Sequence, residues 1–403
     1  MHYKKPNKFF YRLVQFISFF LCTFIFRRKV VRNEIRGVKG PYVVIANHEC
    51  ALDFVTLIGL NRRPMSFVIS NSFYSTLPVQ GIMDKIGVIP KQQFQTTSRN
   101  LKQIKAVIDN GEPLVIYPAG LMCEDGLSTP IPLGTYKFLK WLGVDVYCAK
   151  VKGSYFVMPK WSKGFNPGKI EMDIFKVFDK EELNSLSVEE VKERTREALL
   201  FNAYKDQDER KYSYRKKGEI SGMENVLYVC PDCGKEFTME LKNPHTLKCS
   251  ECGYEAESDA YYMLERKSEN GPELRYVSDW NKMILKKVSD ELSLDTPYEI
   301  KEETDIQMVN KEKKKFESVG NGVVTLTKDC YSLKGTVNGE EISIELTPSL
   351  YPMLPYSPGK YFELQDKDTI YRLVLKNGRM VQKCVNTIKM NFRLLNNITD
   401  EFE

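Results

Sequence analysis

The sequence predicts an α/β fold for its first half, with a mixed sheet covered by helices, followed by a small cysteine-bearing unit and a small antiparallel β domain. Short apolar runs typical of buried strands alternate with segments of helical periodicity up to about residue 204. Two Cys-x-x-Cys pairs follow, and the C-terminal part alternates apolar and polar positions between Asn-Gly dipeptides. A chain of 403 residues is long enough for two or three such units.

The α/β part is defined by strands and helices that alternate along the chain. The runs Tyr42–Ala46, Met65–Ser70 and Leu114–Tyr117 have the composition of buried strands. Helical spacing and capping residues predict helices from Ser98 to Ile108 and, after a capping box, from Ser187 to about Tyr204.

The N-terminal apolar run, Leu13–Phe26, has 14 residues and cations on both sides. As a helix it would reach about 21 Å, against a hydrocarbon core of about 30 Å. It lacks the small-residue cleavage pattern of a secretory signal peptide. We therefore predict a retained, membrane-associated helix within residues 1–35 that lies in or dips into one leaflet, with an ordinary buried helix as the alternative. The flanking cations are Lys4, Lys5, Lys8, Arg12, Arg27, Arg28, Lys29 and Arg32.

The net charge of +6, from 59 basic and 53 acidic residues, is too small for a dedicated nucleic-acid binder but suits an anionic membrane surface. Ten cysteines are present, of which four form two pairs and six are scattered. This pattern is typical of a metal site in a reducing compartment rather than of a disulfide scaffold. We therefore expect a membrane-associated protein on the cytosolic face, with membrane lipids and no nucleic acid among its partners.

His48 follows the first predicted strand of the α/β part by two residues, and Asp53 lies five residues further on, where a helix should begin. This spacing folds the carboxylate back towards the imidazole. An aspartate bonded to one ring nitrogen fixes the tautomer and leaves the other nitrogen free to accept a proton from an attacking hydroxyl. The alternative is a structural histidine at a strand end. A cysteine nucleophile, Cys50 or Cys123, is a further alternative.

Four ordered segments resemble the sequence blocks of the glycerolipid acyltransferases typified by lysophosphatidic acid acyltransferase. They are Asn47-His48 with Asp53, Gly87–Pro90, Tyr117–Gly120 and Ala149–Gly153. The resemblance covers about residues 36–205, and we assign residues 36–218 to an acyltransferase domain. It implies that His48 and Asp53 form the catalytic dyad and that acyl-CoA or an acyl carrier protein thioester is the donor. It also assigns substrate binding to the third block: Pro118, Ala119 and Gly120.

The chain departs from the family pattern at three charged positions. Gln93, Ala119 and Met122 stand where the family usually has arginine, glutamate and arginine. Neither glutamine nor methionine offers the bidentate fork with which arginine holds a phosphate. We therefore hypothesise an acceptor that is a less anionic lipid alcohol or amine. Lys91, Lys150 and Lys152 are candidates for a phosphate contact, or else are merely solvated.

Two Cys-x-x-Cys pairs, each followed by glycine, are separated by 15 residues. This spacing is typical of a zinc ribbon in which two knuckles supply four thiolates to one tetrahedral ion. Four thiolates leave no open coordination position, so the Zn²⁺ is expected to be structural. We place the ribbon at residues 225–258 and a helical connector at 259–300. The predicted ligands are Cys230, Cys233, Cys249 and Cys252.

Residues 301–403 are predicted to form a β-rich accessory domain. Asn321-Gly322, Asn338-Gly339 and Asn377-Gly378 each lie between alternating strands and predict hairpin turns. A helix from Met380 to about Leu395 is expected to close the domain. In strand count and terminal helix it resembles a pleckstrin-homology or GRAM-like module.

These observations predict a membrane-associated O-acyltransferase similar to 1-acylglycerol-3-phosphate acyltransferase. It would move a fatty acyl group from a thioester to a lyso-lipid or glycerolipid acceptor, as in phospholipid biosynthesis. One alternative is a lipid-binding or scaffold protein that kept the fold and lost catalysis. Another treats the ribbon as a nucleic-acid or protein adaptor, although glutamates offset its lysines, which disfavours nucleic acid.

Overall fold

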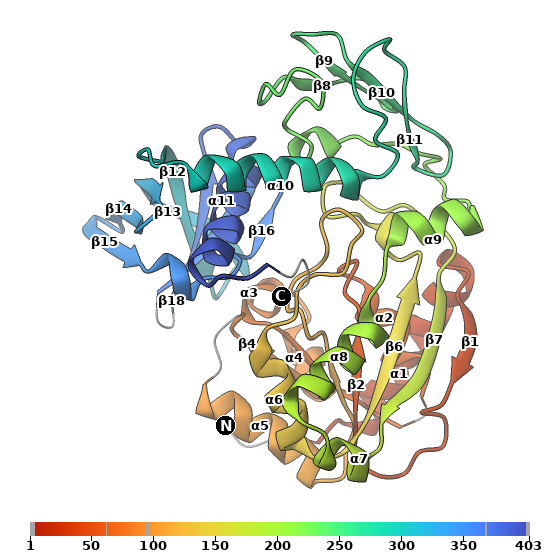
Figure 1. Cartoon of the computed structure of the whole chain (residues 1–403). Coiled ribbons are helices and arrows are strands. Elements are labelled where there is room, and N and C mark those ends of the chain that lie inside the picture. The colour runs from red at the N-terminus through yellow and green to blue at the C-terminus, as the bar shows by residue number, and fades with distance from the viewer. Residues whose placement is uncertain (1–4, 62, 94–96, 367–368, 400–403) are drawn as a thin grey trace. The chain divides into compact units, whose positions relative to one another are not determined.

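The computed structural model describes residues 5–61, 63–93, 97–366 and 369–399 (Figure 1). The chain divides into two compact units. The first contains Met1–Pro159 and Gly164–Lys216, and the second contains Lys160–Lys163 and Lys217–Asp400.

The first unit is built on a seven-stranded sheet. Its strands are β1 (Lys29–Asn33), β2 (Tyr42–Ala46), β3 (Ser66–Ser70), β4 (Val88–Lys91), β5 (Leu114–Ile116), β6 (Asp145–Lys152) and β7 (Glu171–Phe178). They lie in the order β1-β7-β6-β2-β5-β3-β4. β2 is parallel to both β5 and β6, whereas β7 is antiparallel to β6, so the sheet is mixed as predicted. Because β2 and β5 are parallel, the loops that follow them leave the same edge of the sheet.

The helices of this unit lie between and beside the strands. They are α1 (Lys8–Phe20), continued by the π-helix η1 (Leu21–Ile25), α2 (Asp53–Ile58), α3 (Asn71–Thr76), α4 (Gln80–Lys85), α5 (Ser98–Asp109), α6 (Leu133–Leu142), the 3-10 helix η2 (Tyr155–Val157), α7 (Lys180–Ser185), α8 (Val188–Leu199) and α9 (Ala203–Arg210). The predicted capping box of Ser187 with Glu190 starts α8. The single helix expected to reach Tyr204 is instead two helices, since α8 ends at Leu199 and α9 begins at Ala203.

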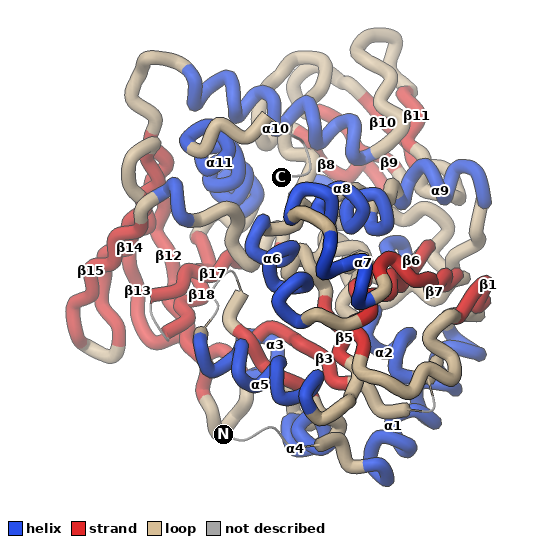
Figure 2. The backbone as a smooth tube through the Cα atoms, turned by 60° about the horizontal axis from the view of Figure 1, so that its bottom comes forward, coloured by secondary structure: helices blue, strands red, loops and turns tan. Residues whose placement is uncertain are grey.

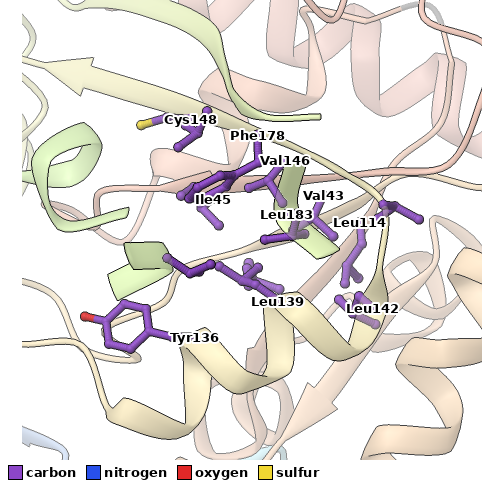
Figure 3. Close-up of a cluster of buried hydrophobic side chains, with 14 of the residues drawn as sticks. Val43, Ile45, Leu114, Tyr136, Leu139, Leu142, Val146, Cys148, Phe178 and Leu183 are labelled. Carbon is purple, nitrogen blue, oxygen red and sulfur yellow. The ribbon is translucent and has the colours of Figure 1, made fainter. Parts of the chain in front are cut away.

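All five residues of β2 are buried, which shows that both faces of the sheet are covered at its centre. On one face Val43 and Ile45 belong to a hydrophobic cluster that includes Leu139 of α6 and Leu183 of α7 (Figure 3). α6 and α8 lie side by side over this face (Figure 2). The cluster therefore holds α8 near the end of β2 from which the His48 loop leaves.

The N-terminal helix begins at Lys8, earlier than the apolar run predicted, and continues without a break to Ile25. Its 18 residues make it long and apolar enough, by length and composition alone, to cross a membrane. One side contacts the domain: the Tyr11 hydroxyl accepts a hydrogen bond from Met65 N, and the Ser18 hydroxyl donates to Val55 O. The other side exposes large apolar side chains: Phe9, Leu13, Phe16, Ile17, Phe19, Phe20 and Phe24.

The second unit begins with the cysteine-bearing segment. It contains the 3-10 helix η3 (Met223–Asn225), then β8 (Met239–Asn243), β9 (Thr246–Cys249), β10 (Glu255–Ser258) and β11 (Leu264–Arg266), and then α10 (Val277–Ser293). The four strands form one antiparallel sheet in the order β11-β10-β9-β8. The connector predicted as helical over 259–300 is therefore helical only in α10. Its first part supplies β11, which pairs with β10, so the apolar periodicity around Trp280 marked the helix but not its start.

The remainder of the second unit is an antiparallel sheet with a terminal helix. Its elements are β12 (Glu299–Asn310), β13 (Lys315–Thr327), β14 (Tyr331–Val337), β15 (Glu340–Leu346), the 3-10 helix η4 (Pro348–Leu350), β16 (Tyr356–Ser357), β17 (Tyr361–Asp366), β18 (Thr369–Leu375) and α11 (Met380–Leu395). The strands lie in the order β15-β14-β13-β12-β18-β17-β16. Val381, Cys384 and Ile388 of α11 belong to the hydrophobic core of this sheet, as predicted for a closing helix. The helix lies beside the strands (Figure 2).

Only one of the three Asn-Gly dipeptides forms a hairpin turn. Asn338 and Gly339 have φ of 51° and 86°, as a tight turn between β14 and β15 requires. Asn377-Gly378 joins β18 to α11 instead. Asn321-Gly322 lies inside β13, where a Cβ on Gly322 would come within 2.7 Å of Lys334 O on the neighbouring strand. Glycine is required there for close backbone approach rather than for a turn.

Candidate active site and metal centre

The loop after β2 brings His48 and Asp53 together. Asp53 is the first residue of α2 and is completely buried. Its Oδ2 lies 3.0 Å from His48 Nδ1 and accepts hydrogen bonds from Glu49 N at 2.8 Å and Cys50 N at 3.0 Å. With Nδ1 held by a carboxylate, the imidazole is oriented before any ligand arrives, and Nε2 is the nitrogen left for proton transfer. The His48 side chain is 22% exposed.

The residues on either side of His48 anchor the loop to β6. The Asn47 side chain accepts from Val151 N and donates to Val151 O, both at 2.7 Å. It also donates to Glu49 Oε1 at 2.8 Å, while Glu49 Oε2 accepts from Tyr155 N at 3.2 Å and Ser154 Oγ at 3.3 Å. Burial raises the pKa of the Glu49 carboxyl well above its usual value. Sequence reasoning overlooked Glu49, although an acidic residue between His48 and Asp53 was a visible signal.

The segment after β5 also contacts His48. The Tyr117 ring lies 4.4 Å from the imidazole, centroid to centroid, tilted by 32°. The Cys123 N–H donates to His48 O at 3.0 Å. Burial raises the pKa of the Cys50 and Cys123 thiols well above the usual value, and Cys50 Sγ donates to Asp53 Oδ1. Both sulfurs are therefore protonated, which does not suit a nucleophilic cysteine.

His48 opens onto a cavity of about 390 Å³. Its lining includes the end of β2, Pro118 and Ala119, together with several apolar side chains. Four residues of α8, namely Glu193, Arg196, Glu197 and Leu199, also line the cavity. The full lining is Ala46, Asn47, His48, Glu49, Pro118, Ala119, Leu121, Cys123, Leu127, Ser128, Thr129, Ile131, Glu193, Arg196, Glu197, Leu199 and Leu200. The volume and apolar character suit part of a lipid chain.

Three residues predicted to bind substrate are not among those that line this cavity. Gly120 has φ of +72°; its N–H donates to Tyr117 O at 3.0 Å, and its carbonyl accepts from Gln93 Nε2 at 2.6 Å. The N–H of Gly120 therefore closes a turn, which its positive φ permits. Lys91 donates to Gln92 O at 3.2 Å, and burial lowers the pKa of its ammonium. Lys152 pairs with Asp206 at 3.5 Å.

In the second unit the four predicted cysteines converge on one point. Their sulfurs all lie within 4.8 Å of one another, with 3.5 Å between Cys230 and Cys252 and 3.8 Å between Cys233 and Cys249. A tetrahedral ion with Zn–S bonds of about 2.3 Å would hold its sulfurs about 3.8 Å apart, so the cluster fits such an ion. His245 is outside the cluster.

A family model described as Acyltransferase matches residues 27–150. The crystal structure of the 1-acyl-sn-glycerophosphate (LPA) acyltransferase PlsC from Thermotoga maritima is similar at 22% identity, with a TM-score of 0.38, over 47% of this chain and 79% of that chain. No curated protein matches the sequence. The family match shows that residues 27–150 are similar to the Acyltransferase family, which agrees with the acyltransferase resemblance drawn from the sequence blocks in that range.

Proposed function

We propose that the protein is a membrane-associated O-acyltransferase that moves a fatty acyl group from a thioester to a lyso-lipid or glycerolipid acceptor. The observation that carries this proposal is the His48–Asp53 pair, in which Nδ1 and Oδ2 lie 3.0 Å apart. Both residues are in the segment that matches the acyltransferase family, and His48 lines a largely apolar cavity. Acyl transfer needs both a base beside the reacting carbonyl and an apolar space for the chain. The site offers the two together.

The proposed reaction needs no covalent enzyme intermediate. His48 Nε2 accepts the proton of the acceptor hydroxyl while the oxygen attacks the thioester carbonyl. The tetrahedral intermediate then expels the thiol, which leaves with the proton returned by His48. Asp53 keeps the ring in the required tautomer and stabilises the imidazolium that forms. Acyl-CoA or an acyl carrier protein thioester supplies the acyl group.

The test is transfer of a labelled acyl group from such a thioester to a panel of lyso-lipid and glycerolipid acceptors. Transfer by the wild type and its loss in His48→Ala would support the proposal. A wild-type protein with intact metal content that transfers no acyl group to any acceptor would instead identify a lipid-binding or scaffold protein.

We assign residues 36–218 to the acyltransferase domain and regard residues 301–403 as an accessory domain. For the four-cysteine cluster we propose a structural Zn²⁺. Thiolate ligation and reduced cysteines suit the cytosolic face of a membrane. The proposed phospholipid-biosynthetic role rests on the family match to residues 27–150.

The proposed membrane contact is the exposed face of α1 and η1. Polar contacts of Tyr11, Ser18 and Gln15 hold the opposite face on the domain, so insertion in the plane of one leaflet keeps them intact whereas a full span would break them. The cations that flank the helix suit an anionic surface.

Replacing Phe16, Phe20 and Phe24 by serine is expected to release the protein from anionic vesicles. These rings are 53–66% exposed, and partial insertion contributes about 1 kcal/mol each, so the partition coefficient should fall by about 100-fold in sedimentation assays. The matched control is Leu350→Ser, an exposed apolar residue in the other unit. Equal vesicle binding by the triple variant and the wild type would refute the proposed contact.

A further inference from the structure

The outer wall of the cavity carries an alternating set of charges that the sequence motifs did not reveal. Glu193, Arg196 and Glu197 of α8 all line it, alongside Ser128 and Thr129. Residues three and four apart share one face of a helix. The Glu193 side chain is 62% exposed and that of Arg196 is 18% exposed, with 3.5 Å between Arg196 Nη1 and Glu193 Oε1. The set therefore rims the cavity with a cation between two anions, and we call it the α8 rim.

The charge of this rim is unfavourable for a phosphomonoester. One guanidinium and two carboxylates sum to one negative charge. A phosphomonoester carries close to two negative charges at neutral pH. The family's charged positions offer no compensation, since Gln93, Ala119 and Met122 are neutral.

A zwitterionic headgroup matches the rim, because it offers an anion to the guanidinium and a cation to the carboxylates. A phosphodiester carries a single negative charge, which suits one guanidinium. An ammonium two carbons away would lie within reach of the carboxylates on the same helix face, because residues at this spacing have Cβ atoms about 5–6 Å apart. The acyl chain of the same molecule would follow the apolar lining formed by Leu127, Ile131 and Leu199.

We propose, on the basis of the acyltransferase function above, that the α8 rim selects the acceptor and that the acceptor is a zwitterionic lyso-phospholipid. Arg196 binds its phosphodiester, and Glu193 and Glu197 bind its ammonium. Lysophosphatidic acid is a poor ligand because its phosphomonoester carries close to two negative charges and the rim carries a net negative charge. Glu193, Arg196 and Glu197 are thus specificity-determining residues, and His48 remains the catalytic base.

Binding to the full-length His48→Ala protein tests the rim without turnover. The probes are 1-hexanoyl lysophosphatidylethanolamine and 1-hexanoyl lysophosphatidic acid, kept below their micelle concentrations, with affinity measured by calorimetry. The zwitterionic lipid is expected to bind about tenfold more tightly than the phosphomonoester, a modest ratio because exposed charges are screened. Adding Glu193→Gln and Glu197→Gln should bring the ratio close to one, and adding Arg196→Gln should weaken both lipids.

The matched control is Glu189→Gln, the same change on the same helix at a residue outside the cavity lining, which should preserve the ratio. Thermal unfolding shows whether each variant is folded. Tighter binding of the phosphomonoester, or a preference that survives loss of both glutamates, overturns the proposal. If wild-type protein transfers acyl groups while the rim variants keep its acceptor preference, the inference fails and the proposed function stands. If the binding preference holds but no acyl transfer occurs, the proposed function fails instead.

Discussion

His48→Ala is expected to lower kcat for acyl transfer by about 10³-fold or more, because the acceptor hydroxyl would lose its general base. Asp53→Asn should cost about 10²-fold or more, even though it keeps the shape of the side chain. Asp53 Oδ2 accepts hydrogen bonds from the imidazole and from two backbone N–H groups, and an amide that presents its NH₂ group there would oppose all three. Steady-state kinetics with a labelled thioester measures both effects.

The loss should fall on kcat rather than on KM, since neither side chain is needed for the apolar contacts that hold the lipid chain. Tyr117→Phe is the matched control beside the same imidazole. It keeps the ring that packs against His48 and removes a buried hydroxyl for which the described residues provide no hydrogen-bond partner. Its kcat should stay near that of the wild type. A folded His48→Ala protein that keeps more than about a tenth of wild-type kcat would show that this imidazole is not the base.

The parts of the site that the sequence predicted are those set by local geometry. His48 and Asp53 are five residues apart in a loop that enters a helix, so their contact needs no knowledge of the rest of the fold. Pro118 and Ala119 were also predictable, because β2 and β5 are parallel neighbours and their loops leave the sheet at one edge. Parallel pairing of short apolar runs is the common arrangement in an α/β sheet.

The parts that were missed depend on contacts between distant segments. The hydrophobic cluster over the sheet, not any motif near His48, brings Glu193 and Arg196 of α8 to the cavity. Periodicity predicted that α8 is a helix with an apolar face, but charges at the border of that face look like ordinary solvated residues. Lys91 and Lys152 show the opposite case, since each is near a motif in sequence but is not among the residues that line the cavity.

Loss of the metal is expected to unfold the ribbon, and the effect should extend through the second unit. In a structural zinc site the binding free energy, about 10 kcal/mol or more, is also folding free energy. The ribbon is held to α10 and α11 by direct hydrogen bonds. Trp280 Nε1 donates to Val229 O at 2.8 Å, and Arg379 donates to Phe237 O and Met239 O, both at 2.6 Å. These carbonyl acceptors lie on backbone that the metal-bound cysteines keep in place. Loss of the metal therefore weakens these hydrogen bonds and removes support from both helices.

The Cys230→Ser/Cys249→Ser protein should therefore contain no zinc, against one ion per chain in the wild type, and its ribbon amides should lose protection from hydrogen exchange. Amides of α11 near Arg379 should become less protected as well, since Lys383 also pairs with Glu236 of the ribbon at 2.5 Å. Cys330→Ser, a partly exposed cysteine outside the cluster, is the matched control and should leave metal content and protection unchanged. An unchanged zinc ratio in the double variant would exclude this cluster as the site. If the ribbon loses zinc but the amides of α11 keep their normal protection from hydrogen exchange, the Arg379 and Lys383 contacts do not couple the ribbon to the β domain.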